Sequence, residues 1–165
     1  LMKKGNITWI LSIVLGLFCA IAMCGCDDTN VGVNNNSTLA SQLTGRDKSC
    51  YDLVSSVVFE FKSPKSVRVV SGTIKSDNSA CLRLTSTNSF GAVTSGYYFI
   101  FQADNGKTVL IDLEKTKEEY GNQTVTSETW EKYMATVENI ELCKATNNFN
   151  ADKINEALAE KFSNY

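Results

Sequence analysis

The residue types that carry most protein chemistry are unevenly represented in this chain of 165 residues. Histidine is absent, which excludes a Ser-His-Asp triad, a Cys-His pair and a histidine-ligated zinc site. Three of the six cysteines fall in the first 26 residues, and the others are Cys50, Cys81 and Cys143. These three form no CxxC motif and have no fourth soft ligand, so we expect no metal site and no cofactor.

The three later cysteines allow one disulfide and one free thiol in an extracytoplasmic chain. We favour a disulfide between Cys50 and Cys143, which we expect on facing helices. The alternative is three buried free thiols, because a thiol packs as a small apolar side chain.

Acidic side chains gather at Asp112, Glu114, Glu118 and Glu119. Catalytic carboxylate pairs need a fixed separation and contrasting environments, and a calcium loop needs EF-hand spacing. These acids lie among Lys115 and Lys117 in a polar segment and lack EF-hand spacing. The sequence therefore predicts a solvated, charge-balanced connection rather than an enzyme site.

Composition places the chain among single-domain globular proteins, with 43% hydrophobic and 21% charged residues. The formal net charge is −2. Nucleic-acid binders carry a surplus of cations to displace counterions, so we expect no nucleic-acid partner.

Residues 1–26 have the layout of an export signal. Lys3 and Lys4 precede an uncharged apolar run over residues 9–23, and Cys26 follows the small residue Gly25. A basic start, an apolar core and a small residue at the end are typical of a secretory signal.

The cysteine at this boundary resembles the lipobox of bacterial membrane lipoproteins. Met23-Cys24-Gly25-Cys26 fits an aliphatic residue, two small residues and a lipidated cysteine, with Cys24 as the second choice of lipidation site. The resemblance implies a lipid-anchored protein on the extracytoplasmic face of the cell membrane. The alternative is an uncleaved anchor, since residues 9–26 are near the length of a spanning helix.

Residues 27–46 are rich in Asn, Ser, Thr and Gly and predict a flexible tether. A single domain over residues 47–165 follows it. Apolar residues recur at helical spacing from Cys50 to Phe61, and Pro64 ends that helix. Four strands are expected next, over residues 67–74, 80–88, 97–103 and 107–113.

The last two strands flank Asp104-Asn105-Gly106, which we interpret as a two-residue Asn-Gly hairpin. That turn pairs Phe101 with Leu110 and Ile100 with Ile111. Ser127 is expected to cap a helix from Glu128 to about Thr136, and residues 137–143 are either its continuation or another strand. Asn150 caps a final helix. The fold class is α+β, an antiparallel meander with the C-terminal helices on one face.

Several short strings resemble a small uncharacterised domain of low-GC Gram-positive bacteria. They are Phe61-Lys62-Ser63-Pro64-Lys65-Ser66-Val67, Asn88-Ser89-Phe90-Gly91 and Gly96-Tyr97-Tyr98, with Lys153-Ile154-Asn155-Glu156-Ala157-Leu158 near the end. The resemblance implies an α+β fold and a source in low-GC Gram-positive bacteria, and it implies no activity.

Two features could form a binding surface. Tyr97, Phe99 and Phe101 alternate on one face of a strand, and form either core, if late helices cover them, or an exposed patch for a partner. Asn88 and Phe90 occupy a loop that we interpret as a structural turn, with Phe90 folded onto the core. We expect a non-catalytic interaction module for a membrane or cell-wall macromolecule, or alternatively a small-molecule or glycan-binding lipoprotein.

The lipidation site is testable by substitution. Cys26→Ala is expected to abolish leader processing and to move the protein out of the detergent phase, because it removes the acyl acceptor. Cys24→Ala is the matched control and should leave both unchanged. Normal processing of Cys26→Ala would show that the lipobox assignment is wrong.

Overall fold

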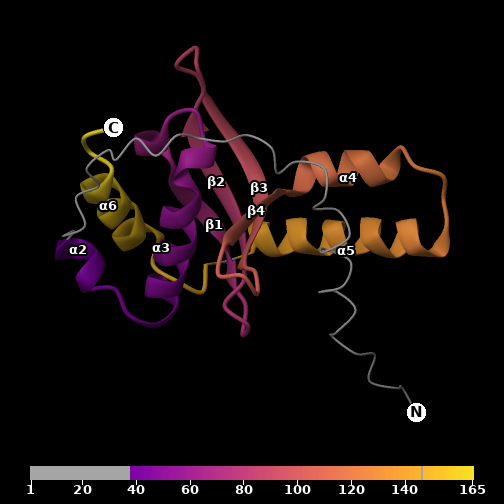
Figure 1. The fold of residues 1–165 in the computed structure, drawn as a ribbon, viewed down its shortest axis with the longest axis horizontal. Coiled ribbons are helices and arrows are strands. Elements are labelled where there is room, and N and C mark those ends of the chain that lie inside the picture. Colours follow the sequence, from indigo (N-terminus) through magenta and orange to yellow (C-terminus); the bar gives the residue numbers. More distant parts are fainter. Residues whose placement is uncertain (1–37, 146) are drawn as a thin grey trace. The chain divides into compact units, whose positions relative to one another are not determined.

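The computed structural model describes residues 38–145 and 147–165 and shows an α+β fold (Figure 1). The leader, Cys24, Cys26 and tether residues 27–37 lie outside the described residues. Within them, no helix has the length and hydropathy needed to cross a membrane.

The sheet is an antiparallel meander of four strands in the order β1-β2-β3-β4, as the sequence predicts. Polar loops join β1 to β2 and β3 to β4, and the β2–β3 hairpin extends beyond the other strands (Figure 1). The strands are β1 (Arg68–Ile74), β2 (Ala80–Thr87), β3 (Val93–Gln102) and β4 (Thr108–Asp112).

Helices precede and follow the sheet. Two of them, α2 and α4, fall where the sequence predicts no helix. The helices are α2 (Thr38–Ser41), α3 (Gly45–Val57), α4 (Leu113–Gly121), α5 (Ser127–Lys144) and α6 (Ala151–Lys161), with short 3-10 turns at Val58–Glu60 and Pro64–Ser66.

The main core lies between one face of the sheet and helices α3 and α6. It contains Leu82, Ile100 and Ile154, each fully buried, together with the α3 side chains Cys50 and Val54. Burying side chains of this size stabilises a fold by about 1.5–3 kcal/mol each, so this layer supplies most of the apolar stabilisation.

The opposite face of the sheet is covered by α5, so the C-terminal helices do not share one face as expected. A second, smaller core cluster joins Cys81 of β2 to Ile140 and Cys143 of α5 and to Leu113. Residues 137–143 belong to α5, which settles the choice between helix and strand. Long helices on both faces leave this short sheet little open surface.

The predicted tether extends too far toward the C-terminus. Residues 38–46 form α2 and the start of α3, and Leu43 is buried in the main core. The Thr38 hydroxyl donates to the Glu160 carboxylate of α6 at 2.8 Å. The polar composition of residues 38–46 does not indicate that the segment is ordered, because a single buried leucine and a single carboxylate contact hold it on the domain.

The predicted register of β4 is wrong by one residue. Phe101 pairs with Val109 and Ile100 with Leu110, because the connection has three residues rather than two. The amide of Gly106 donates to the carbonyl of Ala103, and Gly106 takes a positive φ of 78°. A type I turn followed by a left-handed glycine is the usual three-residue hairpin, and the one-residue shift moves every β4 side chain to the other face.

Side-chain amides close the outer edge of β1. An exposed edge strand offers unpaired N–H and C=O groups to other chains, and this edge is met by three asparagines of α6 and of the α5–α6 connection. Their side-chain oxygens accept hydrogen bonds from edge-strand amides in the pairs Asn155 with Val69, Asn147 with Gly72, and Asn148 with Ile74.

Two of these amides bind both backbone groups of one residue. Asn155 accepts from the Val69 amide at 2.8 Å and donates to its carbonyl at 2.9 Å. Asn148 does the same to Ile74, at 3.0 and 2.9 Å. The asparagines therefore take the place of a fifth strand and tie α6 to the sheet.

Removing one amide tests this closure. Asn155→Ala is expected to lower the free energy of unfolding by about 1–3 kcal/mol, because two part-buried backbone groups lose their partners. Urea unfolding measures the change, and Asn164→Ala, at an exposed position near the C-terminus, is the control with less than about 0.5 kcal/mol. Equal losses for the two variants would contradict the edge-closure role.

Candidate interaction surface

Helix α5 covers two of the three alternating aromatics that the sequence offers as a surface. Tyr97 and Phe99 are half-buried against the second core cluster, so they fit the core interpretation. Phe101 stacks on Phe99 with ring centroids 5.4 Å apart and is also half-buried. Two lysine ammonium groups lie over rings of this aromatic layer. The Lys75 Nζ is 4.9 Å from the Phe99 ring centroid, and the Lys144 Nζ is 5.6 Å from the Tyr97 ring centroid.

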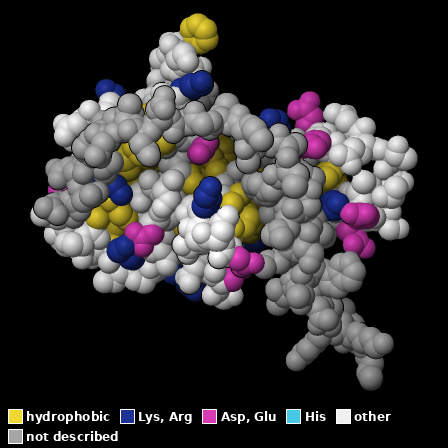
Figure 2. Space-filling view, viewed as in Figure 1, with side chains coloured by type: hydrophobic (Ala, Val, Ile, Leu, Met, Phe, Trp, Pro, Cys, Tyr) yellow, Lys and Arg dark blue, Asp and Glu magenta, His cyan; other side chains and the backbone are white. Residues whose placement is uncertain are grey.

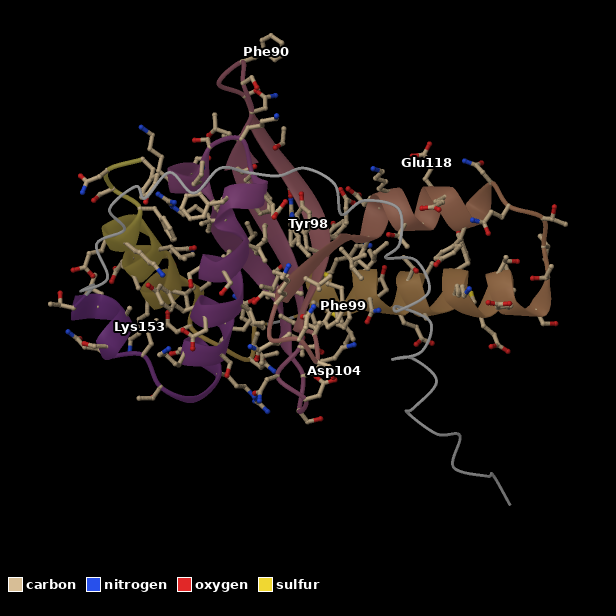
Figure 3. All side chains as sticks on the ribbon, in the orientation of Figure 1. Phe90, Tyr98, Phe99, Asp104, Glu118 and Lys153 are labelled. Carbon is tan, nitrogen blue, oxygen red and sulfur yellow. The ribbon has the colours of Figure 1, made fainter. Side chains whose placement is uncertain are left out.

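Asn88 has the structural role that the sequence predicts. Its side-chain oxygen accepts from the amides of Phe90 and Ala92, at 2.9 and 3.0 Å, and shapes the β2–β3 turn. Phe90 does not fold onto the core as expected: it is 94% exposed and projects from the hairpin tip (Figure 3). The β2–β3 hairpin extends beyond the other strands, and this carries its tip away from the core (Figure 1).

The acidic segment after β4 is a helix rather than a loop. The Asp112 carboxylate accepts hydrogen bonds from the amides of Glu114 and Lys115, both at 3.1 Å, and so caps α4. Glu118 and Glu119 are exposed along it (Figure 3 labels Glu118). A carboxylate at a helix N-terminus accepts hydrogen bonds from backbone amides that have no partner within the helix. The position of Asp112 is therefore accounted for by its role as the N-cap of α4.

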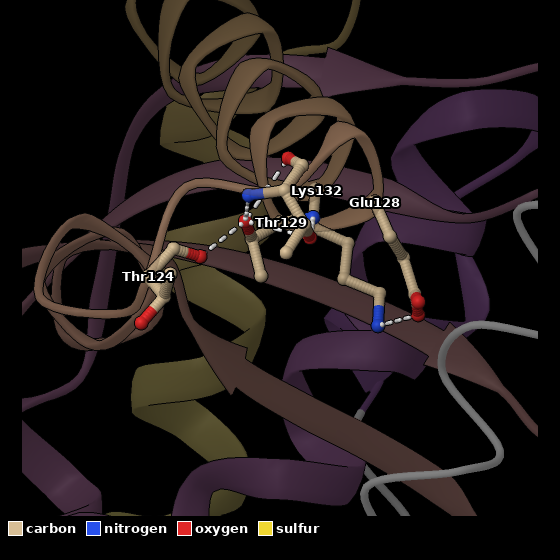
Figure 4. Close-up of polar contacts among 5 residues, drawn as sticks. Thr124, Glu128, Thr129 and Lys132 are labelled. Carbon is tan, nitrogen blue, oxygen red and sulfur yellow. Dashed lines mark hydrogen bonds and ion pairs between the residues drawn. The ribbon is translucent and has the colours of Figure 1, made fainter.

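Helices α4 and α5 lie side by side and project past the sheet as a hairpin (Figure 1). A reciprocal capping box fixes the start of α5, with Thr126 rather than the predicted Ser127 as the N-cap. Thr129 donates its amide to the Thr126 hydroxyl, and Thr126 donates its amide to the Thr129 hydroxyl. The Thr129 hydroxyl also binds the Thr124 carbonyl at 3.0 Å (Figure 4). These bonds hold the connection firmly against the first turn of α5.

An ion pair supports the same turn. The Lys132 ammonium lies 2.6 Å from the Glu128 carboxylate, one helical turn away (Figure 4). The hydrogen bond and the charge of Lys132 lower the pKa of Glu128. Because Glu128 is fully exposed, the pair orients side chains more than it stabilises the helix.

The end of this hairpin carries the candidate site, which we term the hairpin-tip patch. Its side chains surround a shallow depression of about 290 Å³. Trp130 and Tyr133 stack with ring centroids 5.8 Å apart. Trp130 is 55% exposed and Val125 is 80% exposed. The patch consists of Tyr120, Gly121, Val125, Thr129, Trp130 and Tyr133.

The patch is exposed because the sheet ends before it. The buried side chains of α5 are Thr136, Ile140 and Cys143, all in its C-terminal half. Tyr133, seven residues before Ile140, continues the buried stripe of α5 beyond the end of the sheet. Trp130, ten residues before Ile140, lies about 80° around the helix from that stripe. The exposure of Trp130 therefore follows from its position on the helix as well as from how far the hairpin extends.

The predicted Cys50–Cys143 disulfide does not form. All three cysteines of the described domain are free and buried. Cys50 belongs to the main core, whereas Cys143 and Cys81 belong to the cluster on the opposite face of the sheet. The prediction fails because α3 and α5 cover different faces.

The described residues contain no group of three or more His, Cys, Asp or Glu side chains arranged to hold a metal ion. Comparison with models of known protein families finds no match, and comparisons with curated proteins and with solved structures find none either. The resemblance to a low-GC Gram-positive domain therefore stays a prediction.

Loss of the Thr126 N-cap is expected to destabilise the first turn of α5, which carries part of the hairpin-tip patch. Thr126→Ala removes the acceptor of the Thr129 amide and is expected to cost the first turn of α5 about 1 kcal/mol. Hydrogen exchange of the amides in residues 128–131 should then quicken roughly five-fold. Ser127→Ala, at the neighbouring exposed position, is the control. Unchanged exchange in Thr126→Ala would contradict a fixed hairpin tip.

Proposed function

We propose that this chain is a non-catalytic interaction module, held by an N-terminal lipid anchor on the extracytoplasmic face of a membrane. We further propose that the hairpin-tip patch contacts a partner protein. The observation that carries the proposal is the exposure of Trp130 and Val125 beside a depression at the end of a projecting hairpin.

Exposed aromatics of this kind favour a docking role. Trp and Tyr bury large areas with few rotatable bonds, and they dominate the binding energy of protein interfaces. The capping box and the Thr124 contact hold the hairpin in place before a partner arrives. A surface that is already ordered loses less entropy on binding.

Charge favours a protein partner over a lipid or wall polymer. Residues 113–144 contain seven glutamates and four lysines, with no aspartate or arginine, so the hairpin has a net charge of −3. Acidic side chains gather over this end of the molecule in Figure 2. Anionic head groups and polyanionic wall polymers are repelled by such a surface, whereas a protein with a basic rim is attracted.

A second candidate function is binding of a small molecule or glycan. The favouring observation is that Tyr120, Trp130 and Tyr133 line the same depression. Its volume of about 290 Å³ is close to the lower limit of ligand pockets. Saturable thermal stabilisation by a wall fragment, lost in Trp130→Ala, would support this function.

Photo-cross-linking in living cells tests the leading proposal. A benzophenone amino acid replaces Trp130 in the full chain, and Phe59 is replaced in a matched control. Both side chains are 55% exposed, but Phe59 packs against Phe162 and Tyr165 beside α6. We expect one protein adduct of defined mass from position 130 and none from position 59.

A third variant places the cross-linker at Phe90, which is 94% exposed. A protein adduct from position 90 or 59 without one from position 130 contradicts the assignment to the hairpin tip. Lipid or glycan adducts alone from position 130 contradict a protein partner.

A further inference from the structure

The turn between β2 and β3 carries the large apolar side chain with the highest exposure among the described residues. Phe90 is 94% exposed, and Val93 is 73% exposed. Both belong to residues 88–93, which we term the Phe90 finger, at the end of a hairpin that extends beyond the other strands (Figure 1). Residues 84–97 contain no charged side chain. The finger therefore presents apolar side chains on an uncharged tip.

Four backbone amides of the finger already have hydrogen-bond partners. The side-chain oxygen of Asn88 accepts from the amides of Phe90 and Ala92, at 2.9 and 3.0 Å. The Asn88 carbonyl accepts from the Gly91 amide at 3.0 Å, and the Asn88 amide donates to the Ala92 carbonyl at 2.9 Å. Unsatisfied backbone groups are costly in an apolar medium. Because these amides are bonded within the finger, the tip can leave water at a small cost in free energy.

A basic segment lies beside the foot of the finger. The Ser66 hydroxyl oxygen accepts from the amide of Thr87, the last residue of β2, at 2.7 Å. Basic side chains appear below the projecting tip in Figure 2. The segment, residues 58–68, has a net charge of +2 from Glu60, Lys62, Lys65 and Arg68.

Lys62 and Lys65 are the accessible charges of this segment. Both are exposed, and neither forms an ion pair with another described residue. Arg68 is half-buried, and its guanidinium donates to the Lys65 carbonyl at 2.8 Å. Arg68 also shares a shallow depression with Asp152 and Glu156 of α6. The unbalanced positive charge therefore lies on the two lysines.

We propose that the Phe90 finger, together with Lys62 and Lys65, docks the domain onto an anionic lipid surface. Phe90 enters the boundary between head groups and acyl chains, and the lysines contact the phosphate groups. Membrane-surface binding grows with the apolar area buried and with attraction to anionic lipids, and this site offers both. The inference takes its membrane location from the proposed function, but it does not depend on the hairpin-tip patch.

A lipid surface fits the finger better than a protein partner does. The side chains that dominate a protein interface lie at the centre of a broad patch whose rim excludes water. Phe90 lies instead between Ser89 and Gly91 at the end of a narrow hairpin, so its neighbours add little contact area. The α4–α5 hairpin has the opposite net charge, −3 over residues 113–144. The two projections are therefore suited to different partners.

Fluorescence quenching in the full chain tests the docking. An environment-sensitive fluorescent amino acid replaces Ser89, an exposed residue next to Phe90. The protein is reconstituted into vesicles of phosphatidylcholine with phosphatidylglycerol, in which brominated acyl chains quench a fluorophore that reaches them. We expect quenching in these vesicles. We expect little in phosphatidylcholine alone or at high salt, because salt screens the attraction of the lysines to the head groups.

Substitutions separate the apolar and the ionic contributions. Phe90→Ala removes the ring and is expected to lower the ratio of docked to undocked finger roughly ten-fold. Lys65→Gln removes one charge and is expected to lower that ratio roughly five-fold. Lys153→Gln is the matched control and should leave the ratio unchanged. Lys153 is exposed on α6 and lies far from Phe90 (Figure 3).

The following results would overturn the docking. Quenching could be equal in the two kinds of vesicle, or Lys153→Gln could reduce it as much as Lys65→Gln does. A protein adduct instead of a lipid adduct from position 90 in living cells would assign the finger to a protein. A chain that sediments with the vesicles while position 89 stays unquenched contradicts the docking and leaves the anchor intact. A chain that stays in the supernatant contradicts both.

Discussion

The architecture depends on hydrogen bonds between asparagine side chains and the outer edge of β1. A four-stranded sheet with helices on both faces has two edges, and an unpaired buried amide or carbonyl costs about 1–3 kcal/mol. Asn155 and Asn148 each satisfy both backbone groups of one edge residue. Because Asn155 lies on α6 and Asn148 between α5 and α6, these bonds set where both helices meet the sheet.

Placement of α5 on the second face explains the remaining features of the molecule. It converts Tyr97 and Phe99 from an open surface into a half-buried layer, and it places Cys143 in the same small core cluster as Cys81. Since α5 is longer than the face that it covers, its first turns project with α4. Trp130 and Cys143 thus lie toward opposite ends of one helix, the first beyond the sheet and the second pressed against it.

Local signals were enough to predict the meander, the Asn150 cap and the turn role of Asn88. The β4 register failed because Asp104-Asn105-Gly106 fits both a two-residue and a three-residue turn, and only cross-strand contacts decide. The cysteine pairing depends on which face α5 covers, and the exposure of Trp130 depends on how far α5 extends past the sheet; no local pattern specifies either. Likewise, Gly72 is required because a Cβ there would lie 2.1 Å from the Cys81 carbonyl oxygen, a purely tertiary constraint.

Amide hydrogen exchange along β1 tests the central claim most directly. If asparagine side chains replace a fifth strand, the amides of Val69, Gly72 and Ile74 should exchange only through global unfolding, as slowly as those of the central strand β2. Their hydrogen bonds of 2.8–3.0 Å to Asn155, Asn147 and Asn148 predict this result. Exchange of these three amides at the fast rate of an open edge strand would contradict the account.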